Sequence, residues 1–251
     1  SSSAVQGRGR ASSMTLARLL CDPFVWFCVS VVLAPVQELE SLTDVQAYFC
    51  HWTLWLTAGV IGVIAVLTAW FGAKSTLTAS EERVARWYLL NGTLIHGTLD
   101  GCIGLFKANP TFAAQYAKID SRYSGSIGSH ESATVHVLCM VEVIVYVPAC
   151  IWLYVAYHHR RAERDALELV VCVMQAYGTV VYFAPEVLSG MPSASVDTDW
   201  SFTPYYLKYF WFASAMNFLW IIVPTILGKA AWSRIVANAD HSRTGDVQKQ
   251  G

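Results

Sequence analysis

Charged side chains are scarce in this chain. Only 14% of its 251 residues are charged, 55% are apolar, and the formal net charge is −1. Soluble domains have about 25% charged residues, so this composition excludes an ordinary soluble domain. The net charge also gives no argument for nucleic-acid binding. We therefore expect an integral membrane protein whose partners include the lipid bilayer and no nucleic acid.

Motifs of several common enzyme chemistries are missing. The sequence has no CxxC, no GxSxG and no glycine-rich phosphate loop. Its seven cysteines lie in apolar stretches, and an odd number spread in this way indicates small buried side chains rather than a disulfide framework. The adjacent pair His158 and His159 lies in a basic segment at the end of an apolar run, not in a histidine cluster that holds iron. The sequence predicts no metal and no cofactor.

Long apolar runs are the dominant positive signal. A membrane-spanning helix needs about 20 predominantly apolar residues. Five segments are long enough, namely 48–72, 86–106, 133–157, 166–188 and 205–228. The apolar segment 24–34 is too short to span, and a re-entrant or interfacial helix is expected there. The predicted fold class is an all-α integral membrane protein, a bundle of five transmembrane helices with an additional short N-terminal hydrophobic helix.

The composition divides the chain into four parts. Residues 1–13 are small and polar and are expected to form a disordered tail or an expression remnant, followed by the N-terminal interfacial or re-entrant segment 14–47. The transmembrane domain is 48–230, and 231–251 is a polar tail. With five spans, ten Lys and Arg residues fall on one side of the membrane and three on the other. The richer side, which includes the C-terminus, should be cytoplasmic.

Acids inside the apolar runs are the strongest indication of function. Asp100 lies near the middle of the second expected span, where an Asp costs about 2.5 to 3.5 kcal/mol. His96 precedes it by four residues, so both side chains share one face of a helix. Glu142 lies deep in the third span, where it must be protonated or paired with a donor or cation, and His96 is the nearest candidate in chemical terms. We expect a functional role for all three.

The presence of other polar and aromatic side chains in the spans can be explained by structure as well as by function. Gln175 and Asn217 suit a pocket, but interhelical hydrogen bonding explains them equally well. Packing is the simplest explanation for Tyr177, Tyr182 and Trp220, because aromatic residues are common in bundle cores.

Four further groups are expected to play no part in chemistry. Glu168 and Glu186 lie near span ends, and we expect both to be solvated. His51 and His136 are expected to be structural.

Three motifs resemble one known family. The segment after the second span, AAQYAKIDSRYSGS, is similar to the Tyr-Ala-Lys-Gly-Asp-Ser-Arg-Tyr run of sterol isomerases in the emopamil-binding protein family, the EXPERA-domain membrane proteins, with Ile119 in place of glycine. The stretch 174–183, MQAYGTVVYF, is similar to the family's Gln-x-Tyr-Gly, and 216–224, MNFLWIIVP, to its Met-Asn-x-Leu-Trp. The motifs occur in the family's order, and the resemblance covers roughly 48–230.

The resemblance implies a membrane-embedded isomerase of the endoplasmic reticulum with a hydrophobic small-molecule substrate and no cofactor. Isomerases of this family move a sterol ring double bond from delta-eight to delta-seven: an acid protonates the alkene, a carbocation forms, and a base removes a neighbouring proton. The resemblance implies His96 and Asp100 as catalytic residues, and Glu142 is expected to join them because of its own position deep in the third span. The substrate-binding residues implied are Tyr116, Arg122, Tyr123, Gln175, Tyr182, Asn217 and Trp220.

Two departures from the family pattern keep other functions open. Asp100 stands where the sterol isomerases usually have glutamate, and Glu142 lies one helical turn beyond their third-span glutamate. A first alternative is therefore a terpene cyclase that opens a terpenoid epoxide in a natural-product (meroterpenoid) pathway. A second is a non-enzymatic protein that binds sterols or amines. The sequence leaves a homodimer open.

Overall fold

A computed structural model describes residues 39, 41–73, 75–130, 132–190 and 216–250. All regular structure in these ranges is helical, with no β-strand, so the predicted all-α class is confirmed. The expectations for 1–13, 24–34 and the start of the fifth span concern residues outside these ranges. The described helices are α3 Leu42–Cys50, α4 Trp52–Ala73, α5 Ala79–Leu90, η2 Asn91–Leu105, α6 Pro110–Ile119, η3 Ser121–Tyr123, α7 Ala133–Val141, η4 Glu142–Tyr146, α8 Val147–His158, α9 Arg164–Leu188 and α11 Met216–Gln250.

Three helices of the described chain are long and apolar enough to cross a membrane: Ala133–His158, Arg164–Leu188 and Asn217–Asp240. A fourth is added if Leu42–Cys50 and Trp52–Thr68, which meet at 47°, form one bent span. The second expected span is helical as well, because α5 continues without a break into η2. Its helix begins at Ala79 rather than at residue 86.

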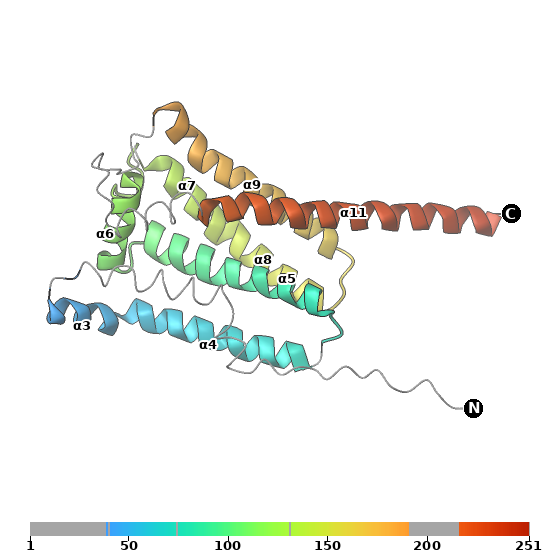
Figure 1. Cartoon of the computed structure of the whole chain (residues 1–251), viewed down its shortest axis with the longest axis horizontal. Helices are drawn as coiled ribbons and strands as arrows, with labels where there is room; N and C mark the ends of the chain where they lie inside the picture. The colour runs from blue at the N-terminus through green and yellow to red at the C-terminus, as the bar shows by residue number, and fades with distance from the viewer. Residues whose placement is uncertain (1–38, 40, 74, 131, 191–215, 251) are drawn as a thin grey trace.

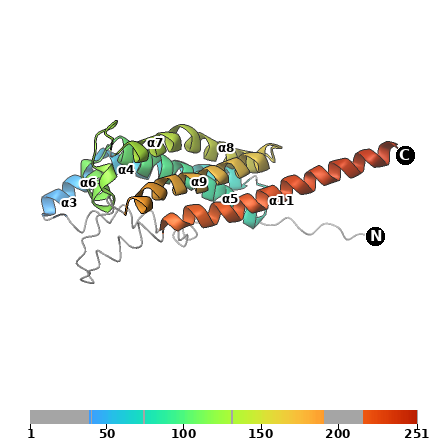
Figure 2. The ribbon, with the colours of Figure 1, turned by 90° about the horizontal axis from the view of Figure 1, so that it is seen from above.

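The long helices lie side by side along the longest axis of the molecule (Figure 1). Short α6 lies across one end of this bundle, and α11 projects beyond the other end toward the C-terminus. The view from above places α11 alongside α9, the helix that it contacts most extensively (Figure 2). The pair α5 and η2 packs against α7, η4 and α8, which continue one into the next.

The main apolar core lies where α5, α8 and α9 meet. Tyr88, Leu153 and Val171 are its centre, and each is at most 1% exposed. Outward side chains of α4 such as Trp55 and Val66 are more than 60% exposed. In a membrane helix these are the positions that face lipid.

Thr78 and Glu81 form a capping box at the start of α5, the helix that continues into the site. The Glu81 carboxylate also accepts a 2.7 Å hydrogen bond from Arg160. Partial burial by itself would raise the pKa of Glu81, but the Thr78 and Arg160 hydrogen bonds lower it below its usual value. The α4–α5 and α8–α9 turns therefore meet at one end of the bundle.

Glu168 is buried, not solvated as its position near a span end suggested. It is 1% exposed and accepts hydrogen bonds from the hydroxyls of Tyr88, at 3.1 Å, and Tyr157, at 2.8 Å. Arg234 of α11 donates to the same carboxylate and, at 2.8 Å, to Asp165. A buried carboxylate held by three donors thus fastens α11 to α9, which explains why a charge is tolerated there.

Candidate active site

His96 and Asp100 lie on one face of η2, as their spacing predicted. His96 Nδ1 is 3.1 Å from Asp100 Oδ2, and the two residues are 3% and 9% exposed. The other carboxylate oxygen, Asp100 Oδ1, lies 3.5 Å from the hydroxyl of Tyr116, which donates to it. An acid and an imidazole held at this distance, out of bulk water, are placed to share or transfer a proton.

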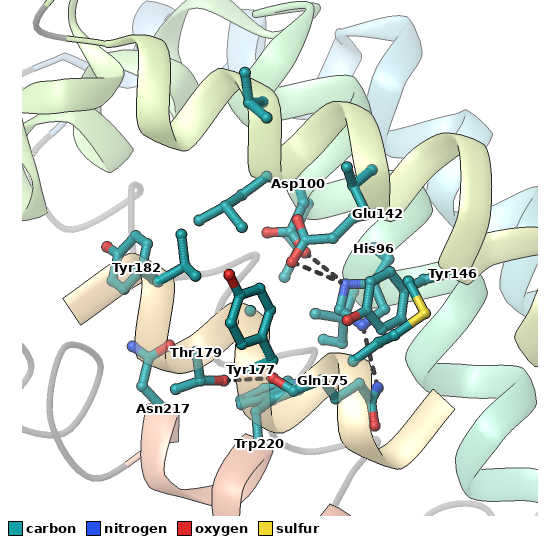
Figure 3. Close-up of a pocket in the computed structure, with 18 of the residues that line it drawn as sticks. His96, Asp100, Glu142, Tyr146, Gln175, Tyr177, Thr179, Tyr182, Asn217 and Trp220 are labelled. Carbon is teal, nitrogen blue, oxygen red and sulfur yellow. Dashed lines mark hydrogen bonds and ion pairs between the residues drawn. The ribbon is translucent and has the colours of Figure 1, made fainter. Parts of the chain in front are cut away.

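Glu142 reaches the same place from the neighbouring helix. Its Oε1 lies 3.5 Å from His96 Nδ1, so His96 is its partner, as predicted. One nitrogen or oxygen atom from each of His96, Asp100 and Glu142 lies within 4.8 Å of the others. We call these three residues the acid–histidine cluster, and they point toward one another in Figure 3.

The donor set of this cluster also fits a metal ion in principle. Among the described residues, the atoms of these three side chains lie close enough together to hold one metal ion. One imidazole nitrogen and two carboxylate oxygens are ligands that zinc and iron accept. Ligation would require His96 Nδ1 to be free of hydrogen, whereas acid–base chemistry does not, so the position of the imidazole proton decides between the two.

Two glycines let η2 approach the third span closely enough to bring the cluster together. A Cβ atom on Gly92 would lie 2.5 Å from Cβ of Cys150. A Cβ atom on Gly101 would lie 2.7 Å from Cγ2 of Val143, the residue after Glu142. Since real Cβ atoms do not come this near, larger residues here would push η2 away from Glu142.

Both segments that bear the cluster are π-helical. Backbone hydrogen bonds in a π-helix join residues five apart, and such segments recur at functional sites. In the third span Glu142 opens the π-helical turn η4, and Pro148 follows two residues after its end. Because proline lacks an N–H, it cannot close an α-helical hydrogen bond to the residue four before it, which favours the wider turn.

Asn91 completes the surroundings of His96 and was not identified from the sequence. Its amide nitrogen lies 3.2 Å from His96 Nε2, and its amide oxygen accepts a 3.0 Å hydrogen bond from Trp220 Nε1. Gln175 Nε2 lies 3.4 Å from the same imidazole nitrogen. Five residues turn an α-helix by about 500°, which would leave Asn91 and His96 about 140° apart. Their contact depends on the π-helical geometry, so an α-helical pattern could not reveal it.

A cavity of about 380 Å³ opens onto the cluster. Pockets of 300 to 1,000 Å³ lined mainly by apolar and aromatic groups are typical of small-molecule sites. Six of the seven expected substrate-binding residues line it: Tyr116, Tyr123, Gln175, Tyr182, Asn217 and Trp220. It also contains Tyr146, whose ring centroid lies 5.1 Å from that of His96. Tyr146 follows Glu142 by four residues, a helical spacing that could have identified it.

Arg122, the seventh expected residue, is not part of the cavity lining. Its guanidinium donates to Asp120, with the shortest contact at 2.6 Å, and to the Tyr182 carbonyl at 3.0 Å, and lies 3.4 Å from Glu186. Burial opposes the charge, but the hydrogen bonds and charge of Asp120 raise the pKa of Arg122 above its usual range. Asp120 in turn accepts a 2.7 Å hydrogen bond from the Tyr182 hydroxyl. The structure thus connects Arg122 to the cavity through Tyr182.

Two expectations for α9 are wrong. Glu186 is 6% exposed and paired with Arg122, because η3 folds back over the end of α9, so it is not solvated. Tyr177 is not a packed core residue: it is 68% exposed while also lining the cavity, which places it at the rim.

Comparisons with known proteins agree with the family suggested by the motifs. Residues 109–229 match the family model described as EBP, EXPERA (EXPanded EBP superfamily). His96 and Asp100 lie before this match, and Glu142, Gln175 and Trp220 within it. This match covers just under half of the chain, and with the relatives described next it makes the chain similar to a divergent member of the emopamil-binding protein superfamily.

Three relatives illustrate the range of the similarity. The chain is 28% identical over 179 residues to the 3-beta-hydroxysteroid-Delta(8),Delta(7)-isomerase of Rattus norvegicus, with 66% of this chain and 71% of the relative covered. It is 29% identical over 186 residues to a probable enzyme of the same name from Arabidopsis thaliana, covering 70% and 76%. It is 27% identical over 227 residues to protoglabretal synthase of Citrus sinensis, covering 84% and 99%.

Proposed function

We propose that this protein is a membrane-embedded isomerase that protonates an alkene of a hydrophobic isoprenoid, stabilises the resulting carbocation and removes a neighbouring proton. A sterol delta-eight to delta-seven isomerisation is the reaction that we favour. The observation that carries the proposal is the acid–histidine cluster itself, two acids and an imidazole within 4.8 Å at an apolar cavity. Relatives named as delta-eight, delta-seven isomerases support it.

Asp100 and Glu142 are the proposed proton donor and acceptor. In the proposed reaction one of the two carboxyls carries the proton and the other is the carboxylate. One carboxyl gives this proton to the alkene, and a carboxylate of the pair takes the proton released from the neighbouring carbon. Since one proton enters the substrate and one leaves, the reaction needs no oxidant, reductant or cofactor.

The cavity walls are proposed to stabilise the intermediate cation. Trp220 and the tyrosines offer ring faces, and the ionised carboxylate offers a full negative charge, both of which attract a cation in a poorly hydrated site. Tyr116, Tyr123, Tyr182, Gln175 and Asn217 are proposed to contact the substrate, with Arg122 holding Tyr182 in place.

Substitution of the cluster tests this assignment. We expect His96→Ala, Asp100→Asn and Glu142→Gln each to lower turnover of a delta-eight sterol in microsomes by at least about 100-fold, the scale of lost acid–base catalysis. The exposed residues His130 and Glu163 provide matched controls, because His130→Ala and Glu163→Gln make the same kinds of change away from the cavity. Unchanged turnover in all three cluster variants would remove the catalytic assignment.

A cyclase or rearrangement of a terpenoid epoxide is the second candidate. The relative named protoglabretal synthase, matched over 99% of its length, favours it, as do the shorter Asp100 and the shifted Glu142. Here the carboxyl protonates an epoxide oxygen, and the cation rearranges before a proton is lost. Assays with a delta-eight sterol and with a terpenoid epoxide separate the candidates. Binding of both with turnover of neither would support the third, a non-enzymatic binding protein.

The membrane arrangement is a further proposal. We place the enzymatic domain at 48–230, because His96 and Asp100 precede the family match, and we give it five spans with the C-terminus in the cytoplasm of endoplasmic reticulum membranes. The bias of Lys and Arg toward one side supports this orientation. A glycosylation acceptor appended to the C-terminus should remain unmodified, and its modification would reverse the topology. A homodimer is tested by crosslinking in native membranes.

A further inference from the structure

The hydrogen bonds around His96 define where its proton lies. The starting point is Trp220, whose indole nitrogen can only donate. It lies 3.0 Å from one terminal atom of the Asn91 amide, so that atom must be the oxygen. The assignment of amide oxygen and nitrogen, normally a choice, is therefore fixed for Asn91.

The other end of the same amide faces His96. With its oxygen turned to Trp220, Asn91 presents its NH₂ group to His96 Nε2 at 3.2 Å. An NH₂ group only donates, so Nε2 must accept and carries no hydrogen. Asn91 is fully buried and His96 is 3% exposed, so bulk water does not compete for this contact.

Gln175 is compatible with this arrangement. Its amide nitrogen lies 3.4 Å from His96 Nε2, and its amide oxygen has no hydrogen-bond partner among the described residues. If the Gln175 amide were flipped, its oxygen would face Nε2 as an acceptor. The Asn91 amide cannot flip in the same way, because its oxygen accepts the hydrogen bond from Trp220. The shorter and fixed contact with Asn91 decides the state of Nε2.

We propose that Asn91 is a positioning residue that locks His96 in the neutral tautomer with its hydrogen on Nδ1. That hydrogen points to the two acids, with Asp100 Oδ2 at 3.1 Å and Glu142 Oε1 at 3.5 Å. His96 then donates to whichever carboxylate is ionised and neither takes a proton from the substrate nor ligates a metal through Nδ1. The catalytic part of this inference rests on the proposed function; the tautomer itself does not.

The titratable groups that face His96 are few. Asp100 comes from its own helix, Glu142 and Tyr146 from η4, and no charged group among the described residues contacts Nε2. A change on the Nε2 side of the ring is therefore attributable to Asn91 and Gln175.

Nitrogen NMR of the full-length protein in lipid nanodiscs tests the tautomer directly. With ¹⁵N-labelled histidine, the His96 signals are identified by their loss in His96→Asn. We expect a protonated Nδ1 and a bare Nε2 in the unsubstituted protein near pH 7. A protonated Nε2 would overturn the inference without need of any variant.

Asn91→Asp is the matching variant, because it replaces the NH₂ donor by an oxygen acceptor of the same size. It should move the histidine hydrogen to Nε2 and lower kcat by at least about tenfold with little change in KM, since a wrong histidine tautomer can abolish far more than that. The control is Asn109→Asp, which alters another buried asparagine, the cap of α6, and should leave the tautomer unchanged.

The outcomes separate this inference from the proposed function. An active protein whose His96 carries its hydrogen on Nε2, or whose tautomer is unaffected by Asn91→Asp, contradicts the inference and leaves the isomerase proposal intact. The expected tautomer, reversed in Asn91→Asp, in a protein that turns over neither sterol nor epoxide supports the positioning of His96 and contradicts the isomerase proposal.

Discussion

At the scale of single residues, the site combines acids that a membrane normally excludes with donors that hold them in place. Asp100 and Glu142 both approach Nδ1 of His96, and Asn91 and Gln175 lie against its other nitrogen and hold the orientation of the ring. Buried polar groups are costly unless each has a partner, and this chain of contacts supplies the partners. The same contacts fix the geometry on which the proposed acid–base role of the cluster depends.

Trp220 has two separable proposed roles. Its indole N–H orients Asn91, and its ring lines the cavity in which a cation would form. We expect Trp220→Phe to lower kcat through the lost N–H, and Trp220→Leu to lower it by about a further tenfold, because a cation–π contact contributes about 0.5 to 2 kcal/mol. Kinetics in microsomes measures both.

Trp232→Leu is the control for these variants. Trp232 lies on the same helix and is 57% exposed, so its loss should leave kcat unchanged. Equal rates for the Phe and Leu variants of Trp220 would show that the ring face does not act on the cation.

The sequence predicted the members of this site better than their connections. The four-residue spacing of His96 and Asp100 places them together in an α-helix and in the wider π-helix alike, so that prediction is confirmed. Asn91 was not predicted, because only a π-helix brings it onto the same face as His96, five positions away. The burial of Glu168 was not predicted, because its partner Arg234 is 66 residues away in the sequence and no local pattern specifies that pairing.

At the scale of helices, close contact between η2 and the third span brings Glu142 to His96 and Asp100. Gly92 packs directly on Cys150, where a Cβ would lie 2.5 Å from the Cβ of that cysteine. We expect Gly92→Ala to destabilise the protein by about 1 to 3 kcal/mol, as overpacking does, and to reduce turnover by separating η2 from α8. Thermal unfolding in detergent, followed by a fluorescence signal that does not depend on cysteine, measures the loss of stability.

Gly62→Ala is a matched control within α4. No atom lies within 4 Å of a Cβ built on Gly62, so alanine there should be neutral or slightly stabilising. The double variant Gly92→Ala/Cys150→Gly removes the opposing Cβ and should recover part of the stability. A Gly92→Ala protein as stable and active as the Gly62→Ala protein would refute the close-contact argument.

At the scale of the whole molecule, ion pairs hold the helices together toward one end of the bundle, and a cavity lies in its middle. Arg234 joins α11 to Glu168 and Asp165 of α9, and α11 brings Asn217 and Trp220 to the cavity. Arg234→Met should lower stability by about 1 to 3 kcal/mol, because it removes a donor from a buried carboxylate. The melting temperature in detergent provides the measurement.

The matching control for Arg234 is Lys229→Met, which removes an exposed cation from the same helix and should have little effect. Adding Glu168→Gln to Arg234→Met removes the uncompensated charge, so the double variant should lose less stability than the sum of the single variants. Simple additivity would mean that the Arg234–Glu168 contact does not fasten α11.

In the proposed mechanism protons enter and leave the substrate through Asp100 and Glu142. Turnover of a delta-eight sterol by the unsubstituted protein in D₂O, followed by mass spectrometry of the product, tests it most directly. We expect one carbon-bound deuterium in each product molecule, because the alkene receives its proton from an acid that exchanges with solvent. A delta-seven product formed in D₂O without carbon-bound deuterium would contradict it.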